Sequence, residues 1–272
     1  MNKSEILPWI WHFDSWNPWK IITLMAWVHW DEKSGQTILE ELCKNLEIIQ
    51  GIVYIIPSAN PRAITGNIRQ TEKNMNRAFH ILPQWDTYED LRAQELLPIF
   101  RESDILLDIH NTLNTENSIP FLISEHSEWN RYFPVDRVIS GLDSLHPGGS
   151  DGYMNTIGKV WLCIESGSIY DPHGAEIAWE SIMNFLRATG NIEWIPQVME
   201  NQESYNLDTI IKAKTTDFRF VKKWLDLEKV KQWELIAHDW TESICAPYDG
   251  IIVFSHETKN IGDEMCVFGK VN

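Results

Sequence analysis

Continuous apolar runs alternate with helical patterns over most of the chain. Residues 21–28 are almost entirely apolar, which predicts a fully buried strand. The apolar positions of residues 38–46 then recur at helical spacing on one face. Residues 51–56 predict a second buried strand, which Pro57 ends. The chain is therefore expected to open as strand, helix, strand.

The same alternation continues to about Gly190. Residues 91–100 suggest a helix, residues 104–109 and 159–164 predict two more buried strands, and residues 175–186 have helical periodicity. Strands that alternate with helices favour an α/β fold. We expect a mixed, largely parallel sheet whose faces are covered by helices.

The pattern changes beyond about residue 195. Short strand-like runs with turn residues between them occupy residues 209–211, 233–237, 250–254 and 265–268. This spacing indicates a small all-β unit. We expect two domains, an α/β domain over residues 1–194 and a β-rich C-terminal domain over residues 195–272.

Composition narrows the classes of function. With 23 Lys and Arg against 39 Asp and Glu, the formal net charge is -16, so a nucleic-acid partner is not expected. No apolar run approaches the roughly 20 residues that cross a bilayer, so no membrane partner is expected either. The N-terminus lacks the apolar core of a signal peptide, and four widely spaced cysteines are typical of reduced core residues. A cytoplasmic protein is expected.

Candidate metal ligands lie at the ends of two predicted strands. His29 and Glu32 follow the first strand, and His110 ends a later one. Ligands bind at the carboxyl ends of strands in open α/β sheets, so these side chains could converge. Two His and one carboxylate with an open position is the ligand set of a catalytic zinc. The alternative for an isolated His-x-x-Glu pair is a solvated loop.

Further polar residues could serve chemistry at the same edge. Glu165 ends a third predicted strand, where a carboxylate could move a proton between water and a leaving amine. Its alternative role is a helix N-cap or a salt bridge. Arg69 and Arg77 lie in a polar loop and could bind carboxylates, although arginine is usual on any surface.

Five motifs together resemble a known family. They are His-x-x-Glu at 29–32 followed by Gly35, Asn-Pro-x-Ala at 60–63, Arg69 before an Asn-Arg pair at 76–77, Asp-Ile-His-Asn-Thr at 108–112, and Glu-x-Gly at 165–167. Their order and spacing resemble the succinylglutamate desuccinylase/aspartoacylase family over roughly residues 20–190. Those enzymes are zinc-dependent amidohydrolases with a carboxypeptidase-like fold.

The resemblance implies a metal centre with one zinc ion per chain. His29, Glu32 and His110 would be the zinc ligands. Asp108, two positions before a ligand, would orient an imidazole from outside the ligand set.

The resemblance also implies the remaining roles. Glu165 would be the general base and acid, and Arg69 would polarise the scissile carbonyl and stabilise the oxyanion. Asn76 and Arg77 would hold the carboxylate of the substrate. The expected activity is hydrolysis of the non-peptide amide bond of an N-acyl amino acid or a related small amide.

The chain departs from the family pattern at several positions. Trp30 and Asp31 replace the usual Gly-Asn between the first two ligands, and Asn74 replaces an aspartate before the Asn-Arg pair. Asn155 stands where aspartoacylases carry a further arginine. The acyl and side-chain preferences of known members therefore do not transfer to this chain.

The C-terminal residues have a resemblance of their own. Residues 246–250 and 261–265 resemble strands of biotinyl/lipoyl-like barrels, which implies a barrel-sandwich-like domain acting as a lid, an assembly module or a stabilising cap. Two alternatives to the deacylase stay open, a metallocarboxypeptidase acting on short peptides and a noncatalytic binding protein that keeps the pocket. The sequence leaves a homo-oligomer open.

Overall fold

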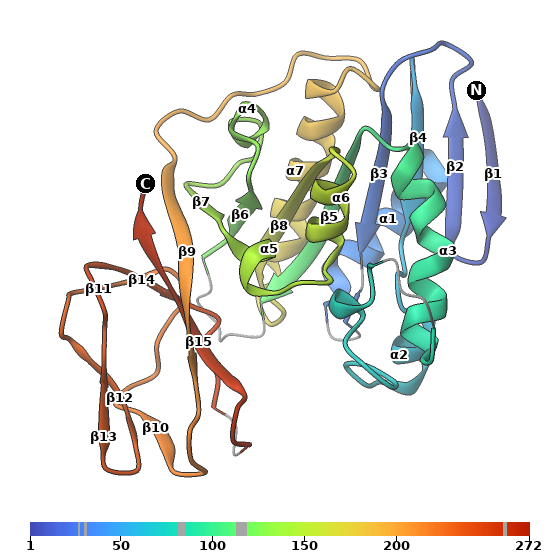
Figure 1. The fold of residues 1–272 in the computed structure, drawn as a ribbon. Helices are drawn as coiled ribbons and strands as arrows, with labels where there is room; N and C mark the ends of the chain where they lie inside the picture. The colour runs from blue at the N-terminus through green and yellow to red at the C-terminus, as the bar shows by residue number, and fades with distance from the viewer. Residues whose placement is uncertain (27, 30–31, 81–84, 113–118, 258–259) are drawn as a thin grey trace.

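A large mixed sheet is the central feature of the fold (Figure 1). The structure is a computed structural model that describes residues 1–26, 28–29, 32–80, 85–112, 119–257 and 260–272. In sheet order its 12 strands are β1 (Asn2–Leu7), β2 (Ile10–Asp14), β4 (Ile52–Ile56), β3 (Ile21–Ala26), β5 (Ile105–Thr112), β8 (Val160–Ser168), β6 (Phe121–Ser124), β7 (Arg137–Ser140), β9 (Glu203–Lys212), β15 (Glu264–Val271), β14 (Gly250–Val253) and β11 (Glu228–Val230). A second, antiparallel sheet of 3 strands contains β10 (Phe218–Phe220), β12 (Leu235–Asp239) and β13 (Glu242–Cys245).

Helices connect the strands of the first 190 residues or so. They are α1 (Lys33–Asn45), α2 (Pro61–Gly66), the 3-10 turn η1 (Met75–Arg77), α3 (Tyr88–Glu102), α4 (Ser127–Asn130), α5 (Leu142–Leu145), α6 (Ser150–Thr156) and α7 (His173–Ala188). The expected mixed α/β architecture is confirmed. Strands β4, β3, β5 and β8 are parallel neighbours. Strand β2 runs antiparallel to β1 and β4, whereas β6 runs antiparallel to β8 and parallel to β7.

Two apolar layers hold the helices on the sheet. Helices α1 and α7 pack on one face, and α3 and α6 pack on the other (Figure 1). Helix α1 approaches the sheet so closely that a Cβ on Gly35 would lie 2.7 Å from Ile109 Cγ2 and 2.9 Å from Ala26 Cβ. Only glycine fits without displacing the helix, and this close packing fixes Glu32, the N-cap residue of α1, at the end of β3.

The ends of the central strands differ from those expected. Strand β3 ends at Ala26, whereas β5 and β8 run on to Thr112 and Ser168. The polar ends of β5 and β8 stay paired, because Asn111 Nδ2 donates to Ser166 Oγ at 2.9 Å. His110 and Glu165 are direct neighbours across these strands, so they lie within the sheet rather than after it.

The sequence interpretation missed an N-terminal hairpin. Strands β1 and β2 form it, and β2 pairs antiparallel with β4 at the edge of the sheet. Ile10 and Phe13 are buried, whereas Trp9, Trp16 and Trp19 are exposed. The alternation of this segment was hidden by its many polar and aromatic residues.

Strand β9 connects the two parts of the chain. It pairs parallel with β7 through residues 203–206 and antiparallel with β15 through residues 205–212. The antiparallel strands beyond it enclose an apolar core of their own. The domain boundary between residues 194 and 195 stays a prediction, since β9 makes the large sheet continuous across the two parts.

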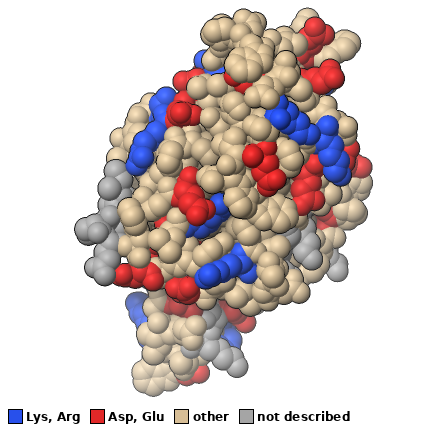
Figure 2. Space-filling view, turned by 90° about the vertical axis from the view of Figure 1, so that its right-hand side faces the viewer, with Lys and Arg blue, Asp and Glu red and all other residues tan. Residues whose placement is uncertain are grey.

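The surface carries both signs of charge. On the face shown in Figure 2, the described Lys and Arg side chains lie in small groups among Asp and Glu and do not merge into one basic area. Among the described residues, no helix has both the length and the apolar character needed to cross a membrane.

Candidate metal centre and its pocket

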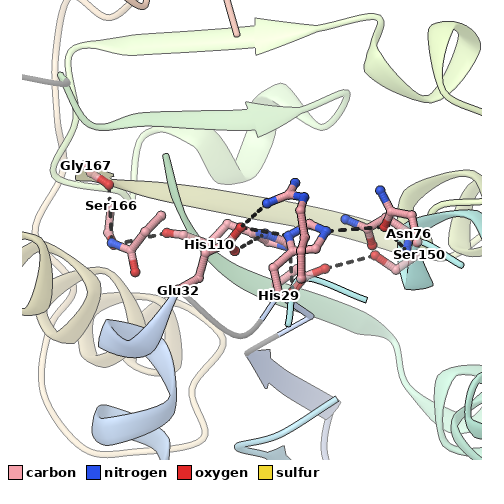
Figure 3. A network of polar contacts seen from close by, with 11 residues as sticks. His29, Glu32, Asn76, His110, Ser150, Ser166 and Gly167 are labelled. Carbon is pink, nitrogen blue, oxygen red and sulfur yellow. Dashed lines mark hydrogen bonds and ion pairs between the residues drawn. The ribbon is translucent and has the colours of Figure 1, made fainter. Parts of the chain in front are cut away.

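His29, Glu32 and His110 converge as the sequence predicted (Figure 3). Glu32 Oε1 lies 2.7 Å from His29 Nδ1, and its Oε2 lies 2.7 Å from His110 Nδ1. One ligand atom from each residue lies within 4.8 Å of the others, and all three side chains are buried. Two imidazole nitrogens and one carboxylate in this arrangement fit the donor set of an open zinc site.

The far nitrogens of both imidazoles face acceptors. His29 Nε2 lies 3.3 Å from Asn74 Oδ1, and His110 Nε2 lies 3.3 Å from Asp108 Oδ1. When each Nε2 carries the proton, each Nδ1 presents a lone pair to the centre, as metal-ligating histidines do. The predicted contact of Asp108 with an imidazole is therefore present, and Asn74 makes the equivalent contact with the other.

A hydrogen-bond chain behind Asp108 was not foreseen. Asp108 Oδ2 accepts from Ser150 Oγ at 3.0 Å, and Ser150 Oγ in turn accepts from Trp161 Nε1 at 2.9 Å. These contacts fix the carboxylate that faces His110. Nothing in the local pattern around Ser150 signals this role, because its partners come from two separate strands.

The electrostatics of the centre favour an ionised Glu32 carboxylate. Burial opposes ionisation of Glu32, but the adjacent His29 and His110 outweigh it and hold the pKa of this carboxyl well below its usual range. Burial also opposes a charged His110, yet Asp108 and Glu32 raise the pKa of that imidazole well above its ordinary value. The carboxylates of Glu32 and Asp108 therefore favour positive charge at the centre, which a bound cation would supply.

Glu165 lies in β8 beside the centre and is 8% exposed. Its Oε2 is buried without a hydrogen-bond partner in the described chain. Burial raises its pKa to about 8; His110 opposes this rise and Glu32 adds to it. Within the described residues Glu165 is neither a helix cap nor part of an ion pair, so neither structural alternative accounts for it.

Arg69, Asn76 and Arg77 line a pocket that also contains the His-Glu-His group and Glu165. Arg69 Nη1 lies 3.9 Å from Glu32 Oε1, and its side chain is 42% exposed. Arg77 Nη1 donates to the carbonyl of Asn76 at 2.7 Å, and burial lowers the pKa of its guanidinium. Arg62 does not join them, because it lies beside Glu72 and over the ring of Tyr88.

Glu89 anchors the loop that carries these residues. It is 0% exposed and lies in the first turn of α3. One oxygen accepts from Thr71 N at 2.7 Å, from Thr71 Oγ1 at 2.5 Å and from Asn60 Nδ2 at 3.3 Å, and the other accepts from Glu72 N at 3.3 Å and Lys73 N at 3.4 Å. Apart from an acidic residue in a first helical turn, nothing in the sequence pattern indicated this anchor.

The pocket has a volume of about 550 Å³ and two unlike walls. One wall comes from the α/β strands and carries the His-Glu-His group with Glu165. The other wall includes residues of the C-terminal strands and their connections, which are Asp226, Phe254, Ser255, His256, Asp263 and Glu264. The C-terminal part therefore contributes directly to the candidate site.

The residues that depart from the family pattern differ in where they lie relative to the site. Trp30 and Asp31 lie outside the described residues. Asn74 contacts His29, as described above. Asn155 does not line the pocket, and its Nδ2 donates instead to Asp143 Oδ2 at 2.8 Å.

A mixed α/β sheet with a buried His-Glu-His group at its edge defines a protein with a candidate metal-dependent centre. The chain belongs to the succinylglutamate desuccinylase/aspartoacylase family, since the sequence model for the "Succinylglutamate desuccinylase/Aspartoacylase catalytic domain" matches residues 18–180. The resemblance inferred from the motifs is thereby confirmed.

Individual proteins of the family resemble the chain over most of its length. N-alpha-acetyl-L-2,4-diaminobutyric acid deacetylase of Halomonas elongata is 27% identical over 277 residues, which cover 89% of this chain and 80% of that protein. The crystal structure of a succinylglutamate desuccinylase/aspartoacylase from Rhodobacter sphaeroides has a TM-score of 0.77 at 21% identity, covering 97% of this chain and 89% of that one. The product-bound ectoine utilization protein EutE (DoeB) of Ruegeria pomeroyi has a TM-score of 0.75 at 20% identity, covering 96% and 88%. The two structures establish the shared fold.

Proposed function

We propose that this protein is a zinc-dependent deacylase that hydrolyses the amide bond of an N-acyl amino acid or a related small amide. The observation that carries the proposal is the buried group of His29, Glu32 and His110 with Glu165 beside it in one pocket. The family membership and the deacetylase relative support the same reaction.

The residues present fit a zinc ion. Their nitrogen and oxygen donors lie close enough to share one cation, and acceptors hold the outer nitrogens of both imidazoles. A zinc ion held by these residues supplies a Lewis acid that polarises a carbonyl and activates water.

Glu165 supplies the proton movement. Its buried, unpaired oxygen can accept a proton from the attacking water and later deliver it to the leaving amine nitrogen. Burial raises the pKa of this carboxyl to about 8, so the protonated form that delivers a proton to the amine is stable near neutral pH, and the ionised form that accepts a proton from water becomes more populated as the pH rises toward 8.

The polar loop supplies substrate contacts. Arg69, close to Glu32, is placed to polarise the scissile carbonyl and to stabilise the oxyanion that forms from it. Asn76 and Arg77 hold the carboxylate of the amino acid, which the planar guanidinium fits with two parallel donors.

Hydrolysis of a panel of small amides tests the proposal. Zinc-loaded and chelator-treated protein are compared on N-acetyl and N-succinyl amino acids and on short peptides, with the released amine quantified. We expect metal-dependent release from the N-acyl amino acids that zinc restores after chelation. Release of C-terminal residues from peptides would support a carboxypeptidase instead, and tight binding without turnover would support a binding protein.

We also propose a cytoplasmic location. The cysteines Cys43, Cys163, Cys245 and Cys266 are free thiols, and most of them are buried. Such cysteines are typical of proteins in a reducing compartment.

A further inference from the structure

The floor of the pocket becomes apolar on the side away from β5. The register of the sheet shows where this happens, because Cys163 of β8 pairs with Asp108 of β5 on one side and with Ile123 of β6 on the other. Adjacent strands lie about 4.8 Å apart, so Ile123 lies roughly 10 Å from the strand that carries His110. Ile123 and Cys163 are both buried and both line the pocket. The lining therefore changes from polar to apolar within two strands of the candidate metal ligands.

Two half-buried side chains from other elements add to this region. Leu142 comes from α5 and Phe254 directly follows β14, and both line the pocket. The ring of Phe254 lies 6.0 Å from that of Phe121, the residue of β6 that pairs with Glu165. The apolar patch, as we name this region, consists of Ile123, Leu142, Cys163 and Phe254.

The backbone of Phe254 has an unusual conformation. Its φ of 54° lies in the left-handed region, which bulky residues rarely adopt. Asp226 Oδ1 supports this conformation by accepting from Phe254 N at 2.6 Å. Of the described non-glycine residues with φ in this region, Phe254 is the one that lines the pocket. Strained residues cluster at sites that bind ligands, so the position of this ring favours a role in binding.

The carboxylates that the C-terminal part brings to the pocket are engaged within the chain. Asp226 accepts the backbone N–H just described. Glu264 Oε2 lies 2.6 Å from His146 Nε2, and Asp263 Oδ2 accepts from Asn260 Nδ2 at 2.9 Å. These contacts satisfy the carboxylates without a charged group from a ligand.

The described lining of the pocket contains Arg69 and Arg77 and no other Lys or Arg side chain. Arg69 lies near Glu32 at the candidate metal centre, and Arg77 is assigned above to the carboxylate of the amino acid. Asn155, where aspartoacylases carry a further arginine, donates to Asp143 instead. A second carboxylate on the substrate would therefore lack an Arg or Lys partner among the described residues.

We propose that the apolar patch is a subsite that binds an uncharged, apolar group of the substrate. This inference rests on the deacylase function proposed above. The substrate class is then an N-acyl amino acid with an aliphatic or aromatic group of several carbon atoms, either in its acyl chain or in its side chain. Burial of such a group contributes about fourfold in affinity for each methylene group. A charged group of the same length would lose its hydration against the patch without gaining a partner there.

A purely structural role of the same side chains makes a different prediction. Ile123 and Cys163 belong to the core on one face of the sheet, and Leu142 and Phe254 pack against it. If packing were their whole role, a longer apolar group on the ligand would bring no gain in affinity. The test must therefore measure ligand preference rather than stability.

Two series of ligands test the proposal and locate the apolar group. One series lengthens the side chain from Nα-acetylalanine through Nα-acetylnorvaline to Nα-acetylnorleucine, with Nα-acetylglutamate and Nα-acetyllysine as charged ligands. The other lengthens the acyl chain from N-acetylalanine through N-butyrylalanine to N-hexanoylalanine, with N-succinylalanine as the charged ligand.

Two quantities are measured for each ligand. The kcat/KM of the zinc-loaded enzyme gives specificity, and calorimetry on the zinc-loaded Glu165→Gln variant gives affinity. We expect both quantities to rise in one of the two series, by about fourfold for each added methylene group. The charged ligands of that series should fall at least about tenfold below the neutral ligand of similar length.

Variants of Leu142 assign the preference to the patch. Leu142→Lys places an ammonium group there, so kcat/KM should fall at least about tenfold for the longest neutral ligand and rise about tenfold for the carboxylate ligand of the same series. Leu142→Met keeps an apolar side chain of similar volume and should preserve the preference. Leu91→Lys, exposed on α3 and outside the pocket, is the matched control and should change nothing. Melting temperatures establish that each variant is folded, and the ligand series on the unmodified protein decides the proposal if Leu142→Lys is not.

The outcomes separate this inference from the proposed function. Metal-dependent hydrolysis that is independent of chain length in both series, or that favours the charged ligands, would overturn the inference and leave the deacylase function standing. Tighter binding of the longer neutral ligands without any hydrolysis would support the inference and overturn the function. An apolar preference that a folded Leu142→Lys protein retains in full would overturn the assignment to this patch.

Discussion

Glu165 lies beside His110, and its buried Oε2 has no partner among the described residues, whereas the nearby Glu32 and Asp108 both form ion pairs with His110. Glu165→Gln keeps the shape of the side chain and removes its ability to move a proton. We expect kcat to fall by about 10²- to 10⁴-fold, while zinc content and melting temperature change little. Glu180→Gln, exposed on α7, is the control. Turnover near that of the unmodified enzyme would show that Glu165 does not carry the proton.

Asn74 holds His29 through a neutral amide, whereas Asp108 holds His110 through a carboxylate. Asn74→Asp would make the two contacts alike and increase the basicity of His29, so zinc affinity should rise about tenfold. Competition with a chromogenic chelator measures this affinity directly. The variant also keeps an acceptor for the Asn76 N–H, so the local turn should survive. An unchanged affinity would mean that Asn74 does not act on the metal centre.

The His-Glu-His group could be predicted because its members follow apolar strands in a recognisable order. Of the contacts that hold these side chains, only that of Asp108 with an imidazole was foreseen. Asn74, Ser150 and Glu89 act through partners that are distant in the chain, and no periodicity encodes how a loop brings them together. Sequence reasoning found the side chains that are proposed to perform chemistry and missed most of those that hold them in place.

At the scale of elements, the loop before η1 depends on ionised carboxylates at the start of α3. Although burial alone would raise the pKa of Glu89, hydrogen bonds from Thr71 and Asn60 lower it. For Asp90, hydrogen bonds from Lys73 and Thr87 outweigh burial in the same way. Because the folded pKa values lie below the ordinary values of 4.5 and 3.8, this stabilisation is complete above those values and is lost as pH falls through the folded pKa.

We therefore expect the loop at residues 68–77 to lose protection from hydrogen exchange as the pH falls below about 4.5, before the central strands do. Glu89→Gln should produce similar loosening at neutral pH. Its loop amides should exchange at least about tenfold faster, since hydrogen bonds to a charged acceptor contribute about 1.5 to 3 kcal/mol. Equal loss of protection in strands and loop would indicate global unfolding instead.

The types of the central elements were predictable and their ends were not. Apolar runs located β3, β4, β5 and β8 because buried parallel strands need such side chains on both faces. Strands β5 and β8 continue through polar residues because each pairs with the other. The hydrophobic pattern of a segment does not show which strand it will pair with. The hairpin of β1 and β2 was missed for a related reason, since one of its strands is largely exposed.

At the scale of the whole molecule, Phe254 joins the C-terminal strands to the α/β part. Its ring lies 6.0 Å from that of Phe121, and it also lines the pocket. Phe254→Ala should lower stability by about 2 kcal/mol and raise KM, without changing the number of zinc ions bound. Calorimetric melting, steady-state kinetics and metal analysis test these expectations. Trp240→Ala, exposed in the same part of the chain, is the control.

The contribution of the C-terminal part to the pocket could not be read from its own sequence. Its alternation predicted strands, and the motif resemblance suggested a lid, an assembly module or a cap. The pairing of β9 with both β7 and β15 is what places this part against the centre, and that pairing joins residues far apart in the chain.

The two-walled pocket has an evolutionary consequence. The residues that are proposed to break the amide bond belong to the α/β part, whereas Asp226, Phe254 and Glu264 are among the lining residues that the C-terminal part contributes. Mutations can therefore accumulate in the C-terminal strands and alter which molecule is accepted, while the inherited chemistry stays intact. A lineage with this architecture can acquire new substrates through mutations in the C-terminal part alone. Relatives that share the ligand motifs therefore need not share a substrate.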